Sequence, residues 1–494
     1  MEIGLANKYN LEDKNAMEVI MSTTAALEKI ARLLGDSIQL QDRSKVIVRD
    51  PKQLRQKIEP VVRAAVLGEE SDRSIACWLV RECALASGVI PSSIHDFYLA
   101  RGRGEIRDDF TVPAINLRAI PFYAAKAVFR ACQQVEAKAL IFEIARSEIG
   151  YSAQRPSEYA TCILGGAIAE GYQGPVFIQG DHYQVSAKKY AVDPEGELGT
   201  IRNLALESMK AGFFNIDIDT STLVDLSQST IPAQQETNYS LSAELAAFIR
   251  AHEPERITIS LGGEIGEVGG RNSTEPELRA YMDGFIDTLG RNAANAPGLS
   301  KISIQTGTSH GGVVLPDGSI AQVKVDFQTL KELSAVAKEY GMGGAVQHGA
   351  STLPEEAFSR FAESNALEVH LATGFQNIMY DRLPQDLLDT IHAYLRENHG
   401  NERKPEQTDE QFYYNTRKRA IGPFKDELWN LSHDVREPIE DAWENQFTLL
   451  FDRLNIAGTK AEIEEFIQPV AIHEPLSSYL GETVEEEDTR DLAD

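Results

Sequence analysis

Histidine and carboxylate side chains follow a series of short apolar runs in the middle of the sequence. They are Asp181, His182, Asp219, Glu264, His310 and His348. These residue types form zinc sites, and a catalytic zinc site combines three protein ligands with an open position for substrate. His182, His310 and His348 would supply the three ligands from three different strands. A single histidine in such a place is more often a hydrogen-bonded core or surface residue, so the prediction depends on all three meeting.

Glycines surround two of these histidines. The sequence around His310 reads GTSHGG, and the sequence from His348 reads HGAST. Without a Cβ atom, the backbone N–H groups of such turns can approach an oxyanion, as they do in phosphate sites near the last two strands of (β/α)₈ barrels. Glycine turns between strands and helices are common, so this signal gains its value from the adjacent histidines.

Eight short runs rich in β-branched and apolar residues alternate with amphipathic stretches. The runs cover residues 110–117, 138–145, 175–182, 213–220, 256–266, 299–308, 343–350 and 366–373. The stretches between them place apolar residues at i, i+3 and i+4. This alternation predicts an α/β protein, a (β/α)₈ TIM barrel, whose strand ends would converge on one mouth. A doubly wound open sheet is the alternative, but no G-x-G-x-x-G sequence follows the first run.

Helical patterns flank the predicted barrel on both sides. Residues 1–109 predict a helical N-terminal extension, residues 110–400 the barrel, and residues 401–480 a helical C-terminal extension. The acidic residues 481–494 contain no aromatic side chain, and we expect them to form a mobile tail.

The composition excludes several classes of partner. The 494-residue chain carries 48 Lys and Arg against 75 Asp and Glu, a formal net charge of -27. Because such a surface repels nucleic acid and anionic membranes, we expect neither as a partner. An anionic substrate would need a local positive site, which a bound metal and backbone N–H groups can supply.

Targeting and membrane segments are not apparent in the sequence. Its N-terminal stretch lacks an apolar core, and apolar residues never run on for the roughly eighteen positions that a membrane helix needs. The four cysteines show no paired metal-ligand spacing and predict reduced core thiols. We therefore expect a soluble, cytoplasmic protein.

Four ordered motifs carry a resemblance to a known family. They read GDHYQVSAKKY, GGEIGEVGG, TSHGG and QHGAST, and they lie between Val112 and Ile378. In order and spacing the chain resembles the class II fructose- and tagatose-bisphosphate aldolases. The resemblance implies a lyase that makes and breaks a C–C bond in a ketose (bis)phosphate such as fructose 1,6-bisphosphate. It also implies a homodimer or a larger homo-oligomer.

The resemblance implies roles for the residues of the predicted metal site. His182, His310 and His348 would bind Zn²⁺ or another divalent metal, with Glu264 as an additional or alternate ligand. The metal would polarise the ketone of the donor and stabilise the enediolate of dihydroxyacetone phosphate. Asp181 would exchange a proton with the aldehyde oxygen.

Further family positions predict the phosphate site. Gly311, Gly349, Ser351 and Thr373 match contacts to the donor phosphate, beside which a monovalent cation commonly binds. Arg417 in YYNTRKR matches the family's C-terminal arginine region more loosely and is a candidate for the distal phosphate. Its alternative interpretation is a solvated charge cluster or a subunit contact.

Two departures from the family pattern leave the substrate open. Where the eighth strand of the family has N-x-D-T, this sequence has H-L-A-T, so His370 and Ala372 stand near the substrate. The mobile-loop glutamate of the family is absent, and Glu275 or Glu277 are displaced candidates for the catalytic base. We predict Glu275 for that role.

Other interpretations remain. The segments FEIARSEIGYSAQRPSEY and AGFFNIDIDTST resemble the accessory, non-catalytic subunit of tagatose-bisphosphate aldolase, so a chaperone-like subunit is the main alternative. An amidohydrolase-type site would begin with an H-x-H pair on the first strand, which has no histidine. A Schiff-base aldolase would need a lysine inside the barrel near the end of a strand. Lys138 and Lys301 instead lie at strand beginnings.

Overall fold

The computed structural model describes most of the chain. The described residues are 23–41, 45–266, 271–307, 315, 325–480, 489 and 492. The predicted ligand His310, the predicted phosphate contact Gly311 and most of the expected tail lie outside them.

Eight parallel strands close into a barrel, as the sequence predicts. The last strand pairs with the first, with Glu368 opposite Val112. The strands are β4 (Val112–Asn116), β5 (Ile141–Ala145), β6 (Gly174–Gln184), β7 (Asn215–Asp219), β8 (Ser260–Glu264), β9 (Lys301–Ile304), β10 (Ala345–Gln347) and β11 (Glu368–Leu371). Because β11 pairs with β4 and β6 pairs with β7, the sheet is closed rather than open.

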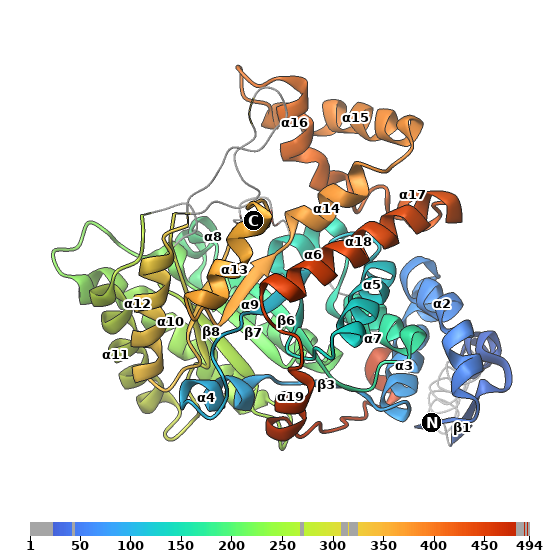
Figure 1. Cartoon of the computed structure of the whole chain (residues 1–494), viewed down its shortest axis with the longest axis horizontal. Coiled ribbons are helices and arrows are strands. Elements are labelled where there is room, and N and C mark those ends of the chain that lie inside the picture. The colour runs from blue at the N-terminus through green and yellow to red at the C-terminus, as the bar shows by residue number, and fades with distance from the viewer. Residues whose placement is uncertain are drawn as a thin grey trace, which may run out of the picture.

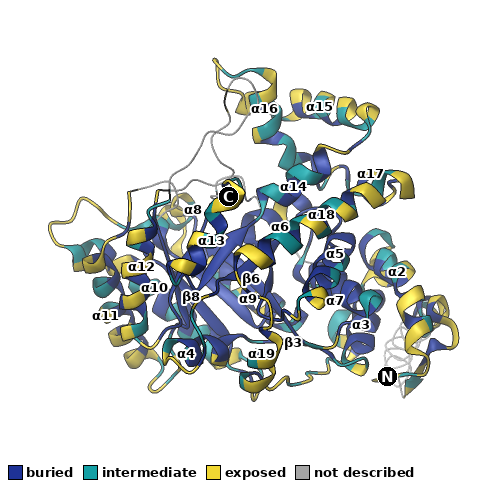
Figure 2. Cartoon of the chain, viewed as in Figure 1, coloured by how far each residue is buried: buried dark blue, intermediate teal, exposed yellow. Residues whose placement is uncertain are grey.

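Helices enclose the barrel, and the strands are its buried interior (Figures 1 and 2). Several helices have a proline in their first turn and follow a polar residue whose side chain accepts a backbone N–H: Asp193 accepts from Gly196, and Thr230 accepts from Ala233. The helices are α5 (Pro121–Gln134), α6 (Arg146–Ser152), α7 (Pro156–Glu170), α8 (Ala187–Val192), α9 (Pro194–Ala211), α10 (Ile231–His252), α11 (Glu275–Asn292), α12 (Phe327–Glu339), α13 (Glu355–Glu363) and α14 (Thr373–Tyr380).

The N-terminal region contains strands as well as the expected helices. Its elements are η1 (Arg32–Ser37), β1 (Ile38–Gln41), β2 (Lys45–Val48), α2 (Pro51–Leu67), α3 (Glu70–Ala86), β3 (Val89–Ser92) and α4 (His95–Gly102). Gly88, with a φ of 79°, follows α3, and the chain then pairs in parallel with the start of β6. A helical interpretation of residues 89–92 is therefore wrong, because the apolar run that looked like the end of a helix is an added strand.

The C-terminal region is helical and packs back onto the barrel. Its elements are α15 (Gln385–His399), η3 (Gly400–Glu402), α16 (Asp409–Thr416), η4 (Arg417–Ala420), α17 (Lys425–Trp429), α18 (His433–Arg453), α19 (Lys460–Phe466) and η5 (Leu476–Tyr479). Helices α15 and α16 project from the rest of the molecule (Figure 1). Trp443 of α18 donates its indole N–H to the carbonyl of Phe375 in α14, at 2.9 Å.

The cysteines are buried in helices and form no disulfide. Cys77 and Cys83 lie in α3, Cys132 in α5 and Cys162 in α7. Burial raises the pKa of Cys77 to about 12, which leaves its thiol protonated and unreactive. None of the helices in the described part of the chain is long and apolar enough to cross a membrane.

The N-terminal region, through α3, meets the C-terminal region at a buried tryptophan. Trp78 of α3 is fully buried, and its indole N–H donates to the carbonyl of Glu474, at 3.0 Å. We expect Trp78→Ala to lower the free energy of unfolding by roughly 3–5 kcal/mol, because it leaves a cavity and an unpaired carbonyl. Trp78→Phe keeps most of the volume and should cost less. Denaturant unfolding measures the loss of stability in both variants. A loss below about 1 kcal/mol for Trp78→Ala would show that this contact between the N-terminal and C-terminal regions lies outside the cooperative core.

Candidate active site

Two of the predicted metal ligands meet at the mouth of the barrel. His182 Nε2 lies 2.5 Å from His348 Nδ1, although 166 residues separate them in sequence. Both side chains are buried. The third predicted ligand, His310, lies outside the described residues. Two of the three predicted histidine ligands are therefore in contact with each other.

The backbone of β6 turns His182 toward its partner. His182 has a φ of 40°, in the left-handed region that residues with a side chain rarely adopt. The pairing of β6 with β7 shifts register between Gly180 and Tyr183, which is the mark of a bulge. Strain of this kind gathers at functional sites, because it re-aims a side chain that a regular strand would point elsewhere.

Two predicted carboxylates face the other ring nitrogen of His182. Its Nδ1 lies 3.3 Å from Asp219 Oδ2 and 3.2 Å from Glu264 Oε2. Asp219 is itself held by the side chains of Gln184, at 2.6 Å, and Ser221, at 2.7 Å. A carboxylate behind a metal-binding imidazole fixes the ring and its tautomer.

The donor atoms at this site suit a divalent metal. Within the described residues, two clusters here place nitrogen and carboxylate oxygen atoms within 4.8 Å of one another. They are His182 with Asp219 and Glu264, and Asp181 with His348 and His370. A third cluster is formed by Asp217, Glu368 and His370, but the ammonium group of Lys301 already lies between its carboxylates.

The site has a strongly negative electrostatic environment. Burial would lower the pKa of His182, but Asp181 and Glu264 raise it well above its usual value. Burial raises the pKa of Glu264 to about 7, and Asp219 adds to the rise while His182 opposes it. The field that favours a proton on these groups also favours a bound cation.

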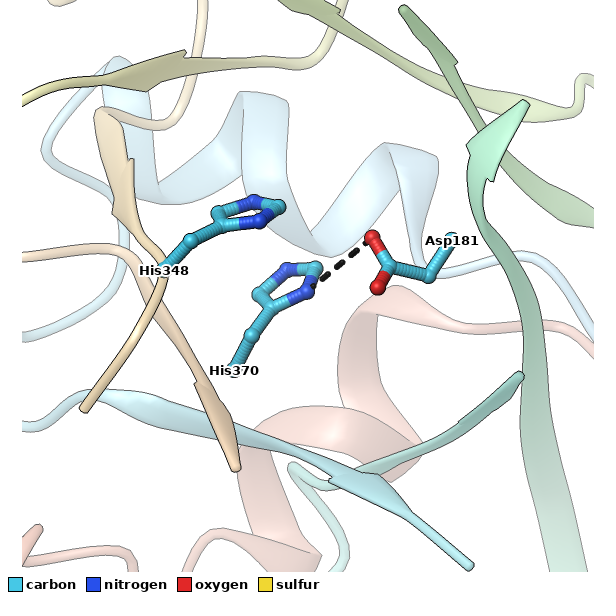
Figure 3. A group of neighbouring side chains, drawn as sticks. All are labelled: Asp181, His348 and His370. Atoms are coloured by element: carbon cyan, nitrogen blue, oxygen red, sulfur yellow. Dashed lines mark ion pairs between the residues drawn. The ribbon is translucent and has the colours of Figure 1, made fainter. Parts of the chain in front are cut away.

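Asp181, the predicted proton-transfer residue, lies between two histidines. Its Oδ1 is 3.9 Å from His182 Nε2 and 3.3 Å from His370 Nδ1. Burial would raise the pKa of Asp181, but His182 and His370 lower it below its usual value. The carboxylate is therefore ionised. Figure 3 shows Asp181 and His370 pointing toward each other, beside His348.

His370 contacts the site from the eighth barrel strand. Its ring stacks on that of His348, with centroids 4.0 Å apart and planes 19° apart. Its Nδ1 lies 2.9 Å from Glu143 Oε2. Burial raises the pKa of Glu143 to about 8, with His370 opposing the rise and Asp181 adding to it. His370 thus links a predicted metal ligand to two carboxyl groups.

A small cavity of about 30 Å³ joins these residues to part of the predicted phosphate site. Gly349, with a φ of 71°, Ser351 and Thr373 line it. The hydroxyl of Ser351 accepts the N–H of Ala372 at 2.6 Å, and α14 begins at Thr373 without a side-chain cap. Unpaired N–H groups at a helix start attract anions.

The cavity wall also contains Arg118, which the sequence analysis missed. Arg118 is buried, and its Nε donates to Glu148 Oε1 at 2.7 Å. Asn116 donates to the other oxygen of Glu148 at 2.6 Å. The sequence could have indicated this residue. Asn116 ends β4 and Arg118 follows it, just as the predicted site residues lie at or after the ends of their own strands.

Two predicted site residues lie away from this cavity. Glu275 begins α11, is exposed, and pairs with Arg279 at 2.8 Å. Arg417 begins η4, where its guanidinium contacts Asn377 and lies 4.5 Å from the centre of the Tyr414 ring. Neither residue lines the cavity.

A larger cavity of about 330 Å³ shares no lining residue with the site. It lies beside α3, α7 and α9. Several of its charged side chains already have partners, as Arg155 has in Glu207 and Glu158 in Lys425. The chemistry-bearing residues therefore mark the smaller cavity as the candidate active site.

Comparison with solved structures finds several similar chains. A fructose-bisphosphate aldolase from Campylobacter jejuni is 18% identical over 75% of this chain and 96% of its own, with a TM-score of 0.43. The YdjI aldolase from Escherichia coli K12 is 11% identical over 75% and 99%, with a TM-score of 0.43. The fructuronate-tagaturonate epimerase UxaE from Cohnella laeviribosi is 12% identical over 78% and 86%, with a TM-score of 0.51. At these identities the likeness concerns the fold alone.

Comparison at the level of sequence is more specific. A search of curated proteins gave no match. The family model described as fructose-bisphosphate aldolase class-II matches residues 106–427, more than half of the chain and the whole of the barrel. The chain belongs to the class-II fructose-bisphosphate aldolase family.

Proposed function

We propose that this protein is a metal-dependent aldolase that cleaves and forms a C–C bond in a ketose phosphate. The observation that carries the proposal is the meeting of His182 and His348, with Asp181 beside them, at the mouth of the barrel. The match to the aldolase family supports the same reaction class. Fructose 1,6-bisphosphate is the first substrate to test, because bisphosphates define the family that the motifs resemble.

Zinc is the metal that we propose. His182 and His348 would hold it, together with His310. Glu264 and Asp219 face the other ring nitrogen of His182, so either would be an additional or alternate ligand on that side or would hold the ring in place. Such an ion supplies a Lewis acid that polarises the ketone carbonyl of the donor half. A monovalent cation beside the phosphate is a further family trait that we include in the proposal.

The protein's own residues would move protons and hold the phosphate. Asp181, ionised and buried, would accept the proton of the hydroxyl group next to the breaking bond, and would return it in the synthetic direction. Gly349, Ser351 and Thr373 would bind the donor phosphate through backbone and hydroxyl groups, with Gly311 beside them. Glu275 remains a candidate base, although it lies outside the cavity.

A Schiff-base mechanism is poorly supported. Lys301 does lie inside the barrel, but its ammonium contacts Asp217 at 2.9 Å and Glu368 at 2.5 Å. Burial would lower the pKa of Lys301, yet these two carboxylates raise it above its usual value. A nucleophilic lysine needs the opposite shift.

Metal removal tests the proposal directly. Treatment with a strong chelator should abolish cleavage of ketose phosphates, and added Zn²⁺ or Co²⁺ should restore it. The His348→Ala variant should show reduced zinc content by elemental analysis. Full activity in chelator would refute the metal-dependent mechanism. Bound zinc without turnover on any ketose 1-phosphate or 1,6-bisphosphate would favour the accessory-subunit alternative.

The role of Asp181 is tested by removing its carboxylate. Asp181→Ala should bind zinc at the normal stoichiometry but lose on the order of 10² to 10⁴ in turnover, because the hydroxyl proton would have no acceptor. Steady-state kinetics and metal analysis of the same preparation measure both quantities. A rate close to that of the wild type would exclude Asp181 from proton transfer.

Arg118 is the guanidinium in the cavity wall, so we propose that it binds the second anionic group of the substrate. Arg118→Met should lower kcat/KM for a ketose 1,6-bisphosphate by roughly 10- to 100-fold and affect a ketose 1-phosphate less. Arg118→Lys should keep part of the preference. Arg155→Met removes an arginine away from the cavity and is the control. An equal loss on both substrates would assign Arg118 a structural role only.

A further inference from the structure

Charged side chains fill the barrel interior beneath the candidate active site. Lys301 of β9 is fully buried, and its ammonium contacts Glu368 of β11 at 2.5 Å and Asp217 of β7 at 2.9 Å. The amide oxygen of Gln179 in β6 accepts from the same ammonium at 2.7 Å. Four strands thus meet at one buried lysine.

His370 connects this buried cluster to the cavity. Glu368 and His370 are two residues apart on β11, so their side chains point to the same face of the strand. The Nε2 of His370 lies 2.6 Å from Glu368 Oε1, the same oxygen that contacts Lys301. The Nε2 side of the imidazole ring is therefore held by Glu368, which is itself paired with Lys301.

The other ring nitrogen of His370, Nδ1, lies beside two carboxyl groups, Glu143 Oε2 at 2.9 Å and Asp181, but neither contact is aligned as a hydrogen bond. His370 Nδ1 and Asp181 Oδ1 are 3.3 Å apart, and both side chains are 5% exposed. Within the described part of the chain, neither atom has an aligned hydrogen-bond partner. A buried polar atom in that state is costly unless a ligand or water completes it. Both residues line the cavity, so a ligand bound there would lie next to both side chains.

We infer that His370 is a catalytic residue that donates a hydrogen bond from Nδ1 to the same substrate hydroxyl oxygen that Asp181 deprotonates, and that Glu368 and Lys301 position its ring. This inference rests on the proposed aldolase function. The reacting oxygen loses its proton to Asp181 while the N–H group of His370 stabilises the negative charge that develops on it. The donor is preorganised because its ring cannot turn without breaking the contact with Glu368.

The inference explains the altered eighth strand. Where the family motif N-x-D-T has an amide and a carboxylate, this chain has His370 and Ala372. The imidazole is supported by Glu368 at the start of its own strand, β11, and through Glu368 by Lys301 at the start of β9. The substitution is thus part of a set of interacting residues.

Removal of the donor tests the catalytic part. His370→Leu should lower kcat for cleavage on the order of 10²- to 10³-fold, as loss of one preorganised donor does, while His370→Gln, which keeps an N–H group, should retain part of the rate. Exchange of the donor ketone's α-proton with solvent does not involve the other half of the substrate, so it should survive in His370→Leu. Equal loss of cleavage and exchange would overturn the inference.

Binding of an uncleavable ligand gives a readout that does not need turnover. A hexitol 1,6-bisphosphate keeps the substrate's hydroxyl groups but has no ketone. Calorimetry should show roughly 10-fold weaker binding to His370→Leu than to the wild type, whereas equal affinity would overturn the contact. Failure of the wild type to cleave any ketose phosphate would instead overturn the proposed function, and the inference with it.

Variants of the two supporting residues, Lys301 and Glu368, test whether they position the ring of His370. Lys301→Met and the milder Glu368→Gln should lower kcat at least 10-fold without a matching change in KM, and neither should worsen His370→Leu when combined with it. Lys138→Met is the matched control, because Lys138 is a partly buried lysine just before β5 that pairs with Glu464 at 2.7 Å. If Lys301→Met fails to fold, Glu368→Gln decides. A normal rate in folded variants would overturn the positioning role.

Discussion

The ion pairs of Lys301 stabilise charged side chains in the interior of this barrel. Barrel interiors are usually filled by layers of apolar side chains, but here Asp217 and Glu368 point inward beneath the active site. Two buried carboxylates are tolerable only when a cation lies between them. The lysine therefore allows the interior to be polar, and the polar interior in turn supports His370 and Asp181.

The backbone of β6 is the second constraint on the site. His182 adopts a positive φ beside a register shift, which turns its ring toward His348 and leaves its other nitrogen facing Asp219 and Glu264. Asp181, the preceding residue, faces His370 instead. Neighbouring residues on one strand thus serve two parts of the site because the strand is irregular where they lie.

Much of the fold could be predicted from the sequence, because eight apolar runs alternate with amphipathic helices and only a few architectures satisfy that order. The meeting of His182 and His348 followed from the rule that parallel strand ends converge. Lys301 begins its strand as predicted, but its inward direction was missed, because a place at the start of a strand says nothing about where the side chain points. The alternation of side chains along β9 carries that information: Lys301, Ser303 and, beyond the strand, Gln305 all contact residues of the site or its support.

Contacts between distant parts of the chain have a consequence for synthesis. β4 has its partner β11 more than two hundred residues later, Thr111 donates to the carbonyl of Leu454, and Trp78 contacts Glu474. A ribosome releases the N-terminal segments long before those partners exist. We therefore expect apolar surface of the nascent polypeptide to stay uncovered until nearly all of the chain has been translated.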